Sequence, residues 1–321
     1  MLVGAEWHSE GMYRERPSTI AHAVVWSSTV TTDEEHRVLP DGCLDLLWSG
    51  GRLVVAGPDT VAHLASWRAG TPFVGLRLSA GVGPRVLGLP AHELRDQRVP
   101  LDALWPGAEV RRLAEQLAEA AEAAEMAADG RAGPAARITG SEAAAIAEAT
   151  DPGALLEAAG RLADGRPAAP GARLEARRRP GNTSPPDPGA LLEAARRFAD
   201  GRPADPGALL EAVAVRRLGE GAPADPVVER VAWRLGQGAA VGDVAREVGL
   251  SARQLHRRSL DAFGYGPKTL SRILRLHRAL ELGRSGAPAA DAAYAAGYAD
   301  QAHLSREARS LSGVTLTTLV A

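Results

Sequence analysis

Near its carboxyl end the sequence contains one pattern twice, as DVAREVGLSARQLHRRSLDAFG from Asp243 to Gly264 and as DAAYAAGYADQAHLSREARSLSG from Asp291 to Gly313. Each copy predicts a short helix, a turn at a glycine and a second helix, which together make a helix-turn-helix unit. Gly249 and Gly297 stand at the two turns, where a positive φ causes glycine no steric strain. Two such units predict an all-helical domain that reads two stretches of DNA major groove.

The second helix of each unit has its own start signal. Ser251 and Gln254 have the spacing of a capping box, and Asp300 is placed to cap the corresponding helix of the second unit. Ala245 and Ala293 are small enough to let the paired helices approach closely. Both units are therefore expected to be tightly packed.

The outward positions of the second helices are polar or cationic, which suits hydrogen bonds to base edges and phosphates. The candidate DNA-binding residues are Arg253, Gln254, His256, Arg257, Arg258, Gln301, His303, Ser305 and Arg306. We expect Arg257 and Arg306 to be the most damaging single losses. For any one arginine, a phosphate contact or a solvated surface position is the competing interpretation.

With both units in order and a basic helix between them, the region resembles the DNA-binding domain of the AraC/XylS family of bacterial transcription regulators. The run GYGPKTLSRILRLHRALEL at 264–282 is similar to the family's linker helix, and GYADQAHLSREARSLSGVT at 297–315 is similar to its C-terminal signature. The resemblance implies a first reading set on one helix and a second on the other. These sets are Arg253, His256 and Arg257, and Gln301, His303 and Arg306.

Three positions depart from the family pattern. Ser259 and Ala308 stand where the family usually has a large apolar residue, and Leu316 stands where proline is common. Phe263 and Leu260 are the candidates to fill the space left in the first unit.

Charge is distributed unevenly along the chain. The whole sequence has a formal net charge of −2, yet residues 226–321 contain 13 basic and 8 acidic residues, a net charge of +5. The excess of cations coincides with the helix-turn-helix pattern, as binding to DNA phosphates requires.

The sequence predicts an α+β multidomain protein. Short apolar runs between turns predict a small mainly-β domain at 1–105, with strands in HAVVWSS from His22, CLDLLW from Cys43, RLVVAG from Arg52 and FVGLRLS from Phe73. A connecting helix is expected at 106–128, a low-complexity linker at 129–225 and the all-α double helix-turn-helix domain at 226–321.

Parts of the first domain, RVLPDGCLDLLW and GLPAHELRDQRVPLDALW, are similar to an N-terminal domain of uncharacterised function found in one branch of the same family. That resemblance implies effector sensing or dimerisation. Cys43 is the only cysteine, so we expect a buried structural thiol, with no disulfide and no multi-cysteine zinc site. The histidines of this region lack ligand spacing, and no metal or cofactor is predicted.

The predicted connecting helix has an apolar stripe. Its members, at alternating three- and four-residue steps, are Val110, Leu113, Leu117, Ala120 and Ala124. The stripe suits pairing with a second copy of the chain or packing on the chain's own β domain, and we favour the latter.

The linker contains a tandem repeat with a period of 18 residues. DPGALLEAAGRLADGRPA from Asp151 recurs as DPGALLEAARRFADGRPA from Asp187 and begins again as DPGALLEAVAVRRL from Asp205. Each copy has an aspartate to cap a helix and a proline at the first helical position. We expect a spacer with short, marginal helices, and a partner-binding array is the alternative.

The predicted function is that of a sequence-specific DNA-binding transcriptional regulator that is not an enzyme. Its two recognition helices are expected to read major-groove segments about 34 Å apart on one side of a promoter duplex. One alternative is a degraded regulator with weak, largely non-specific DNA binding. Another is a relative of DNA-alkyl-repair enzymes, whose chemistry needs a zinc-bound cysteine cluster that a single cysteine cannot supply.

Double-stranded DNA is the expected partner. An unidentified small-molecule effector, RNA polymerase and a second copy of the chain are further candidates. No apolar run approaches the roughly 18 residues that a membrane-spanning helix needs, so a cytoplasmic protein without a membrane segment is expected.

Overall fold

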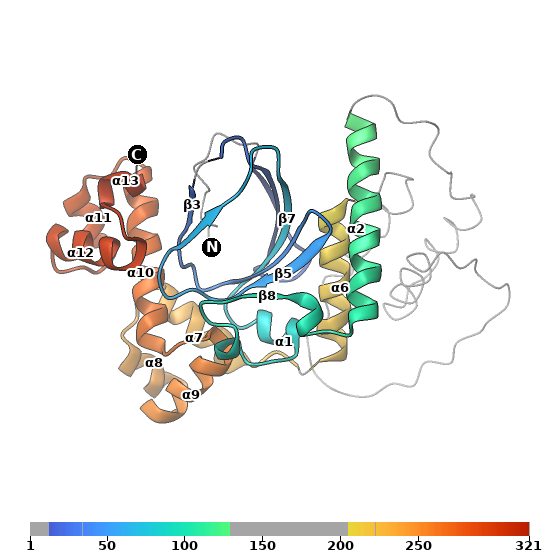
Figure 1. The fold of residues 1–321 in the computed structure, drawn as a ribbon. Coiled ribbons are helices and arrows are strands. Elements are labelled where there is room, and N and C mark those ends of the chain that lie inside the picture. Colours follow the sequence, from blue (N-terminus) through green and yellow to red (C-terminus); the bar gives the residue numbers. More distant parts are fainter. Residues whose placement is uncertain (1–12, 34, 129–204, 222, 321) are drawn as a thin grey trace, which may run out of the picture.

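Figure 1 shows the computed structural model of the chain, which describes residues 13–33, 35–128, 205–221 and 223–320. The described residues up to 105, called here the β domain, are mainly strands, and those from 223 onward are helical. The predicted fold class, a mainly-β domain followed by a helical helix-turn-helix region, is confirmed.

The β domain contains two antiparallel sheets. One has six strands in the order β1-β2-β7-β4-β5-β8, and the other pairs β3 with β6. Their bounds are β1 Arg14–Pro17, β2 Val24–Thr29, β3 Glu35–Val38, β4 Leu44–Ser49, β5 Arg52–Ala56, β6 His63–Ser66, β7 Pro72–Leu78 and β8 Arg98–Pro100. The four runs that the sequence predicts to be strands form β2, β4, β5 and β7.

The central strands alternate between two environments because successive side chains point to opposite faces of a sheet. Leu44, Leu46 and Trp48 of β4 are buried in the apolar core of the β domain. The intervening Asp45 faces the other way and lies 3.5 Å from Arg77 of β7. The sheet thus has an apolar side toward the helices and a side with buried charges.

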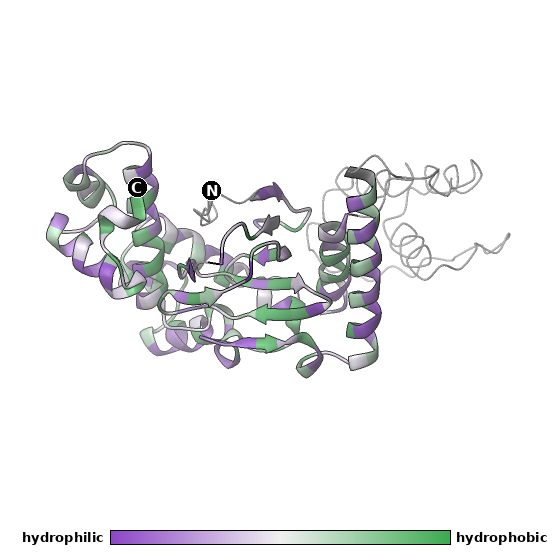
Figure 2. Cartoon of the chain, turned by 45° about the horizontal axis from the view of Figure 1, so that its top comes forward, coloured by the Kyte–Doolittle hydropathy of each residue, from purple (hydrophilic) through white to green (hydrophobic). Residues whose placement is uncertain are grey.

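Helices cover the apolar side of the large sheet. They are α1 (Gly83–Leu87), α2 (Gly107–Ala128) and α6 (Pro206–Glu220), with short 3-10 turns η1 (Ala91–Glu93) and η2 (Leu101–Ala103). In Figure 1, α2 and α6 run side by side along one flank of the β domain. Figure 2 shows that the outer side of α2 is hydrophilic and that the central strands are mostly hydrophobic.

The apolar stripe of α2 packs within its own chain. Val110, Leu113 and Leu117 belong to the same buried cluster as the β4 side chains, whereas Ala124, near the end of the stripe, is exposed. The stripe therefore packs on the chain's own β domain, which is the one of the two predicted uses that the sequence analysis favours.

Helix α6 differs from expectation, because its residues fall within the predicted low-complexity linker. Leu210 and Ala214 are fully buried against the β domain. Asp205 accepts a hydrogen bond from the Gly207 amide, as its capping position predicts. The difference has a physical reason: after DPGALLEA this copy continues as VAVRRL, which supplies apolar side chains. The copies that begin at 151 and 187 lie outside the described residues.

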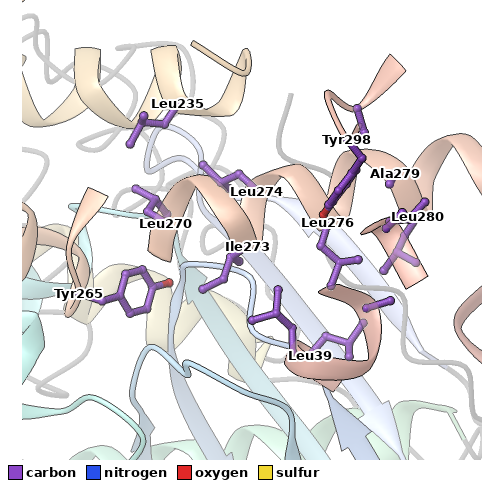
Figure 3. Close-up of a cluster of buried hydrophobic side chains, with 14 of the residues drawn as sticks. Leu39, Leu235, Tyr265, Leu270, Ile273, Leu274, Leu276, Ala279, Leu280 and Tyr298 are labelled. Carbon is purple, nitrogen blue, oxygen red and sulfur yellow. The ribbon is translucent and has the colours of Figure 1, made fainter. Parts of the chain in front are cut away.

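The carboxyl-terminal helices surround α10 (Pro267–Arg284), which is buried along much of its length. Around it lie α7 Pro226–Gly236, α8 Val241–Glu247, α9 Ala252–Phe263, α11 Ala289–Ala295, α12 Gln301–Ser312 and α13 Leu316–Val320. Figure 1 shows α8 and α9 at one end of α10 and α11 to α13 at the other. In Figure 3, Leu39 of the β domain lies in the same cluster as Ile273 and Leu276 of α10.

Candidate nucleic-acid interface

The first helix-turn-helix unit consists of α8 and α9, called here the first unit. Gly249 in its turn has a φ of 66°, so the positive φ predicted at this glycine is observed. The Ser251 hydroxyl accepts a hydrogen bond from the Gln254 amide at 3.3 Å, and the Gln254 side-chain oxygen accepts one from the Ser251 amide at 2.9 Å. This is the predicted capping box, and it occupies the oxygen of the Gln254 side chain.

The second unit consists of α11 and α12. Gly297 in its turn has a φ of 84°. Asp300 caps α12 by accepting a hydrogen bond from the His303 amide at 2.6 Å, as predicted. The Tyr298 ring is buried beneath this turn and meets the His303 ring edge to face, with centroids 5.2 Å apart.

All nine predicted DNA-binding residues lie on α9 or α12. Seven are exposed, namely Arg253, Gln254, His256, Arg257, Arg258, Gln301 and Arg306. The other two, His303 and Ser305, are half-buried. The two helices thus present the predicted residues in two groups, one at each end of α10 (Figure 1).

Seven of the nine side chains make no hydrogen bond or ion pair with any part of the chain that the structure describes. Of these seven, His256 and His303 lie against neighbouring groups and Ser305 is half-buried, which leaves four exposed side chains. These are Arg253, Arg257, Gln301 and Arg306. Two belong to α9 and two to α12, so each helix keeps polar groups that are not committed to its own domain.

Three others have intramolecular contacts that the sequence did not reveal. Arg258 lies 3.3 Å from Asp225, the residue that caps α7. The His256 ring lies against Gly266, where an added Cβ atom would meet it at 2.6 Å. Together with the packing of His303 on Tyr298, these contacts orient the side chains against their own domain.

A carboxylate holds α12 on α10. Glu307 of α12 accepts hydrogen bonds from the Arg272 guanidinium at 2.8 and 3.1 Å, and Arg275 lies 3.7 Å away. The hydrogen bond from Arg272 lowers the pKa of the Glu307 carboxyl below its usual range. Because this contact holds one face of α12 against α10, it determines which face of α12 is exposed, and that face includes Arg306. The only feature of the sequence that could have predicted this contact is the three-residue spacing of Arg272 and Arg275, which places both on one face of a helix.

The positions that depart from the family pattern are in the core. Ser259 is buried, and its hydroxyl has no hydrogen-bond partner among the described residues. Ala308 is fully buried in the second unit. Phe263, a candidate to compensate in the first unit, is in the core, and Leu260 is half-buried.

The β domain touches the carboxyl-terminal ends of α9 and α12. Near α9, His92 lies 3.4 Å from Asp261, and Arg95 donates a hydrogen bond to the Gly264 carbonyl at 3.3 Å. At α12, Arg37 donates to the Ser312 carbonyl at 2.6 Å, and the Ala62 amide donates to the Leu311 carbonyl at 2.7 Å. A different part of the β domain therefore reaches each helix-turn-helix unit.

A buried polar cluster lies on the charged side of the large sheet. Arg77 is 3.4 Å from Asp41 and 3.5 Å from Asp45, and the Trp26 indole donates to Asp45 at 2.9 Å. Burial, followed by the nearby Asp41, raises the pKa of the Cys43 thiol well above its ordinary value, which keeps the thiol neutral. Neutral thiols are poor nucleophiles.

Neither a metal-binding cluster nor a membrane-spanning helix occurs among the described residues. No group of three His, Cys, Asp or Glu side chains among them is placed to hold a metal ion. No helix in the same residues is long and apolar enough to cross a membrane.

Comparisons with known proteins match the two ends of the chain separately. A family model described as a helix-turn-helix domain matches residues 244–321, and one described as a domain of unknown function (DUF6597) matches residues 18–100. No curated protein matches the sequence.

Solved structures of ToxT from Vibrio cholerae are similar to the chain over most of its length. An apo variant from strain SCE256 is 10% identical, covers 96% of this chain and 98% of that chain, and has a TM-score of 0.37. ToxT from strain O395 bound to (E)-4-(8-methylnaphthalen-1-yl)but-3-enoic acid is 9% identical, covers 97% of each chain and has a TM-score of 0.35.

Two glycine-hinged helix pairs on a shared central helix, with polar and cationic outer faces, define a DNA-binding protein of the double helix-turn-helix class. The chain carries a helix-turn-helix domain at its carboxyl end, preceded by a region that matches a domain of unknown function. The helix-turn-helix domain supports a DNA-binding transcription regulator.

Proposed function

We propose that the chain regulates transcription by binding specific promoter sequences, with α9 and α12 each entering one of two successive major-groove segments. The observation that carries this proposal is the set of uncommitted side chains on both helices: Arg253, Arg257, Gln301 and Arg306. Arginine can bind guanine through two hydrogen bonds, and glutamine can bind adenine in the same way.

The connection between the units supports simultaneous binding. Both recognition helices pack around α10, whose buried residues include Leu270 near one end and Leu280 near the other. A continuous, well-packed helix holds the units at a fixed separation, and successive major-groove segments lie about 34 Å apart. A duplex that does not match this separation must bend, and its flexibility then contributes to specificity.

The nine candidate residues take three roles in this proposal. Arg257 and Arg306 read base edges, and Arg253, Gln254, Gln301 and Ser305 bind bases or phosphates beside them. His256, Arg258 and His303, which touch their own domain, contact the DNA backbone and hold the helices in register.

The test is a fluorescence-polarisation titration with duplexes recovered from genomic fragments that the purified full chain retains. Arg257→Ala and Arg306→Ala should each weaken specific binding by about 5- to 150-fold, because a good bidentate base contact contributes about 1–3 kcal/mol. Arg52→Ala is the matched control, since Arg52 is exposed on β5, away from the helix-turn-helix units. An Arg257→Ala variant with unchanged affinity would contradict the assignment.

A weakly binding, non-specific regulator is the second candidate, because the buried Ser259 hydroxyl lacks a described partner and Ala308 leaves the second core with small side chains. Repeating the titration at several salt concentrations separates the two candidates. A steep salt dependence with no preference between operator and random duplex would favour the non-specific regulator.

The β domain is, in the same proposal, the part that senses an effector or sets the oligomeric state. Its contacts with the ends of α9 and α12 support a link between its shape and DNA binding. RNA polymerase and a second copy of the chain are further proposed partners. Sedimentation of the full chain with and without operator DNA measures the second of these directly.

A further inference from the structure

Helix α6 fills a groove on the β domain with its first two turns. Leu210 is fully buried there. Gly207 lies so close to Val25 that an added Cβ atom would meet the Val25 side chain at 2.3 Å. The groove therefore selects a residue without a side chain at one position and an apolar residue three positions later.

Charged groups select the helix at two further positions. One oxygen of Glu211 accepts hydrogen bonds from the hydroxyls of Ser18 at 2.7 Å and Thr19 at 2.8 Å, and from the Thr19 amide, while the other accepts from Arg16 at 3.0 Å. Arg16 also lies 3.3 Å from Asp205. Burial alone would raise the pKa of the Glu211 carboxyl, but these hydrogen bonds outweigh it and hold the pKa below its usual range. The groove thus recognises an aspartate followed six positions later by a glutamate.

All of these selected residues lie within DPGALLEA, which spans residues 205–212. The same eight residues recur without change at 151–158 and at 187–194. The chain therefore contains three segments that satisfy the selective features of one groove.

The copies diverge where α6 makes its remaining contacts. Ala214 is fully buried, and the equivalent residues are Gly160 in the copy at 151 and Arg196 in the copy at 187. Glycine fits this position without adding volume, whereas arginine would place a charged side chain in the core. The copy at 151 is therefore the better alternative occupant.

Helix α6 nevertheless has contacts that neither copy can reproduce. The Arg217 guanidinium lies 4.1 Å from the centre of the Trp105 ring and binds Glu109 at 2.7 Å. Both upstream copies have alanine at the equivalent position. Consequently α6 should be the preferred occupant and the upstream segment a weaker competitor.

We propose that this groove is a receptor for the DPGALLEA sequence and that residues 151–158 occupy it in exchange with α6. Residues 129–204 join α2 to α6, so the upstream segment is tethered to the β domain on both sides. Tethering of this kind gives effective concentrations on the order of millimolar, so a weak intrinsic affinity is sufficient.

The exchange would change the connection between the two ends of the molecule. Asp205 follows Asp151 by 54 residues, so occupation by the upstream copy lengthens the chain between the groove and α7 by that number. This releases the helix-turn-helix units from the short connection that α6 provides. The inference does not rest on DNA binding, and it is tested without DNA.

Amide hydrogen exchange of α6 in the full chain provides the test. Exchange requires α6 to leave the groove, and an upstream competitor increases the population of that open state. A variant with Leu156→Asp and Glu157→Ala should slow the exchange of α6 amides at least about threefold. In this variant no competing segment fills the groove when α6 leaves it, so the open state is less populated. Ala158→Asp is the matched control, because its counterpart Ala212 is exposed on α6.

The other outcomes decide against the proposal. Equal exchange in the double variant and in the wild type would overturn it. Slowing by Leu192→Asp with Glu193→Ala alone would assign the role to the copy at 187, and a dependence on protein concentration would assign it to a second chain. As an independent readout, a synthetic peptide of residues 150–164 added to the wild-type chain should accelerate α6 exchange with saturation, and the peptide with Glu157→Ala should not.

Discussion

The two helix-turn-helix units follow one pattern but are filled differently. The first unit buries Val244, Leu255 and Phe263. The second relies on alanines such as Ala293 and Ala308, with Tyr298 and Leu304 supplying the larger side chains. Its α11 and α12, together with α10 and α13, also border a pocket of about 520 Å³ lined by small residues, including Gly283 and Ala292.

Different forces therefore hold the same backbone pattern in the two units. In the first unit, a capping box and apolar packing fix the recognition helix. In the second unit the buried apolar side chains are smaller. The ion pairs of Glu307 with Arg272 and Arg275, called here the Glu307 clamp, therefore contribute more to holding α12 on α10. We therefore expect the second unit to be the looser of the two, and four changes test this difference.

The largest effect should come from truncating the equivalent core leucines. Leu255→Ala and Leu304→Ala should each destabilise their unit by about 2–5 kcal/mol, because both side chains are fully buried. Leu304 borders the pocket, so water can enter the space left behind, and its truncation should cost less than that of Leu255. Residue-resolved hydrogen exchange of α9 and α12 in the full chain measures both. A larger loss at Leu304 would reverse the comparison.

The next effect should come from the clamp. Glu307→Gln should destabilise the docking of α12 by about 1 kcal/mol, because charge-assisted hydrogen bonds are lost while the exposure of Arg272 reduces their worth. Operator affinity should fall with it, since the face of α12 that includes Arg306 is then held less firmly. The matched variant is Glu247→Gln, whose carboxylate binds Arg230 and Arg234 at the surface of the first unit. Equal effects on operator affinity would remove the proposed distinction.

Acid should loosen the second recognition helix by a smaller amount. The pKa of Glu307 is lowered in the folded chain relative to its ordinary value of 4.5. A depressed pKa stabilises the folded state above the unfolded-state pKa, and this stabilisation disappears as the pH falls through the folded-state pKa. Exchange of α12 amides, corrected for intrinsic rates, should therefore rise as the pH decreases below 4.5. In Glu307→Gln this rise should be absent, and its persistence would assign the effect to another group.

The smallest effect should come from filling the pocket. Ala289 is half-buried in the pocket wall, so Ala289→Leu has room for its side chain. We expect a stabilisation of the second unit by about 0.5–1 kcal/mol, in the range of cavity-filling substitutions. The exposed neighbour Ala290→Leu is the control. Destabilisation by Ala289→Leu, measured by α11 exchange, would show that the pocket cannot accept added volume.

The helix-turn-helix units were predictable because their signals are local. Ser251 with Gln254, Asp300 and the two turn glycines act within a few residues of their own position, and each does in the structure what its local sequence predicts. The outward positions on α9 and α12 follow from the same helical periodicity. Their exposure could therefore be predicted, with His303 and Ser305 less exposed than the rest.

The docking of α6 could not be predicted in this way. Its polar anchor pairs Glu211 with Arg16, which is 195 positions away in the sequence. An isolated helix of this length and composition is marginal, and only the groove makes it stable. The same reasoning explains why the contact of Arg258 with Asp225 was missed, since it depends on how α7 packs beside α9.

The attachment of the β domain at Gly264 and at Ser312 has a mechanical consequence. Because the β domain is bonded to the carboxyl-terminal ends of both α9 and α12, it can set the distance between the two helices. A ligand or partner that changes the distance between Arg37 in β3 and Arg95 in its turn would change the distance between α9 and α12. It would thereby change the spacing of the two major-groove segments that the helices can bind at once. Selection among promoters could then be tuned by spacing alone, with every base-reading side chain unchanged.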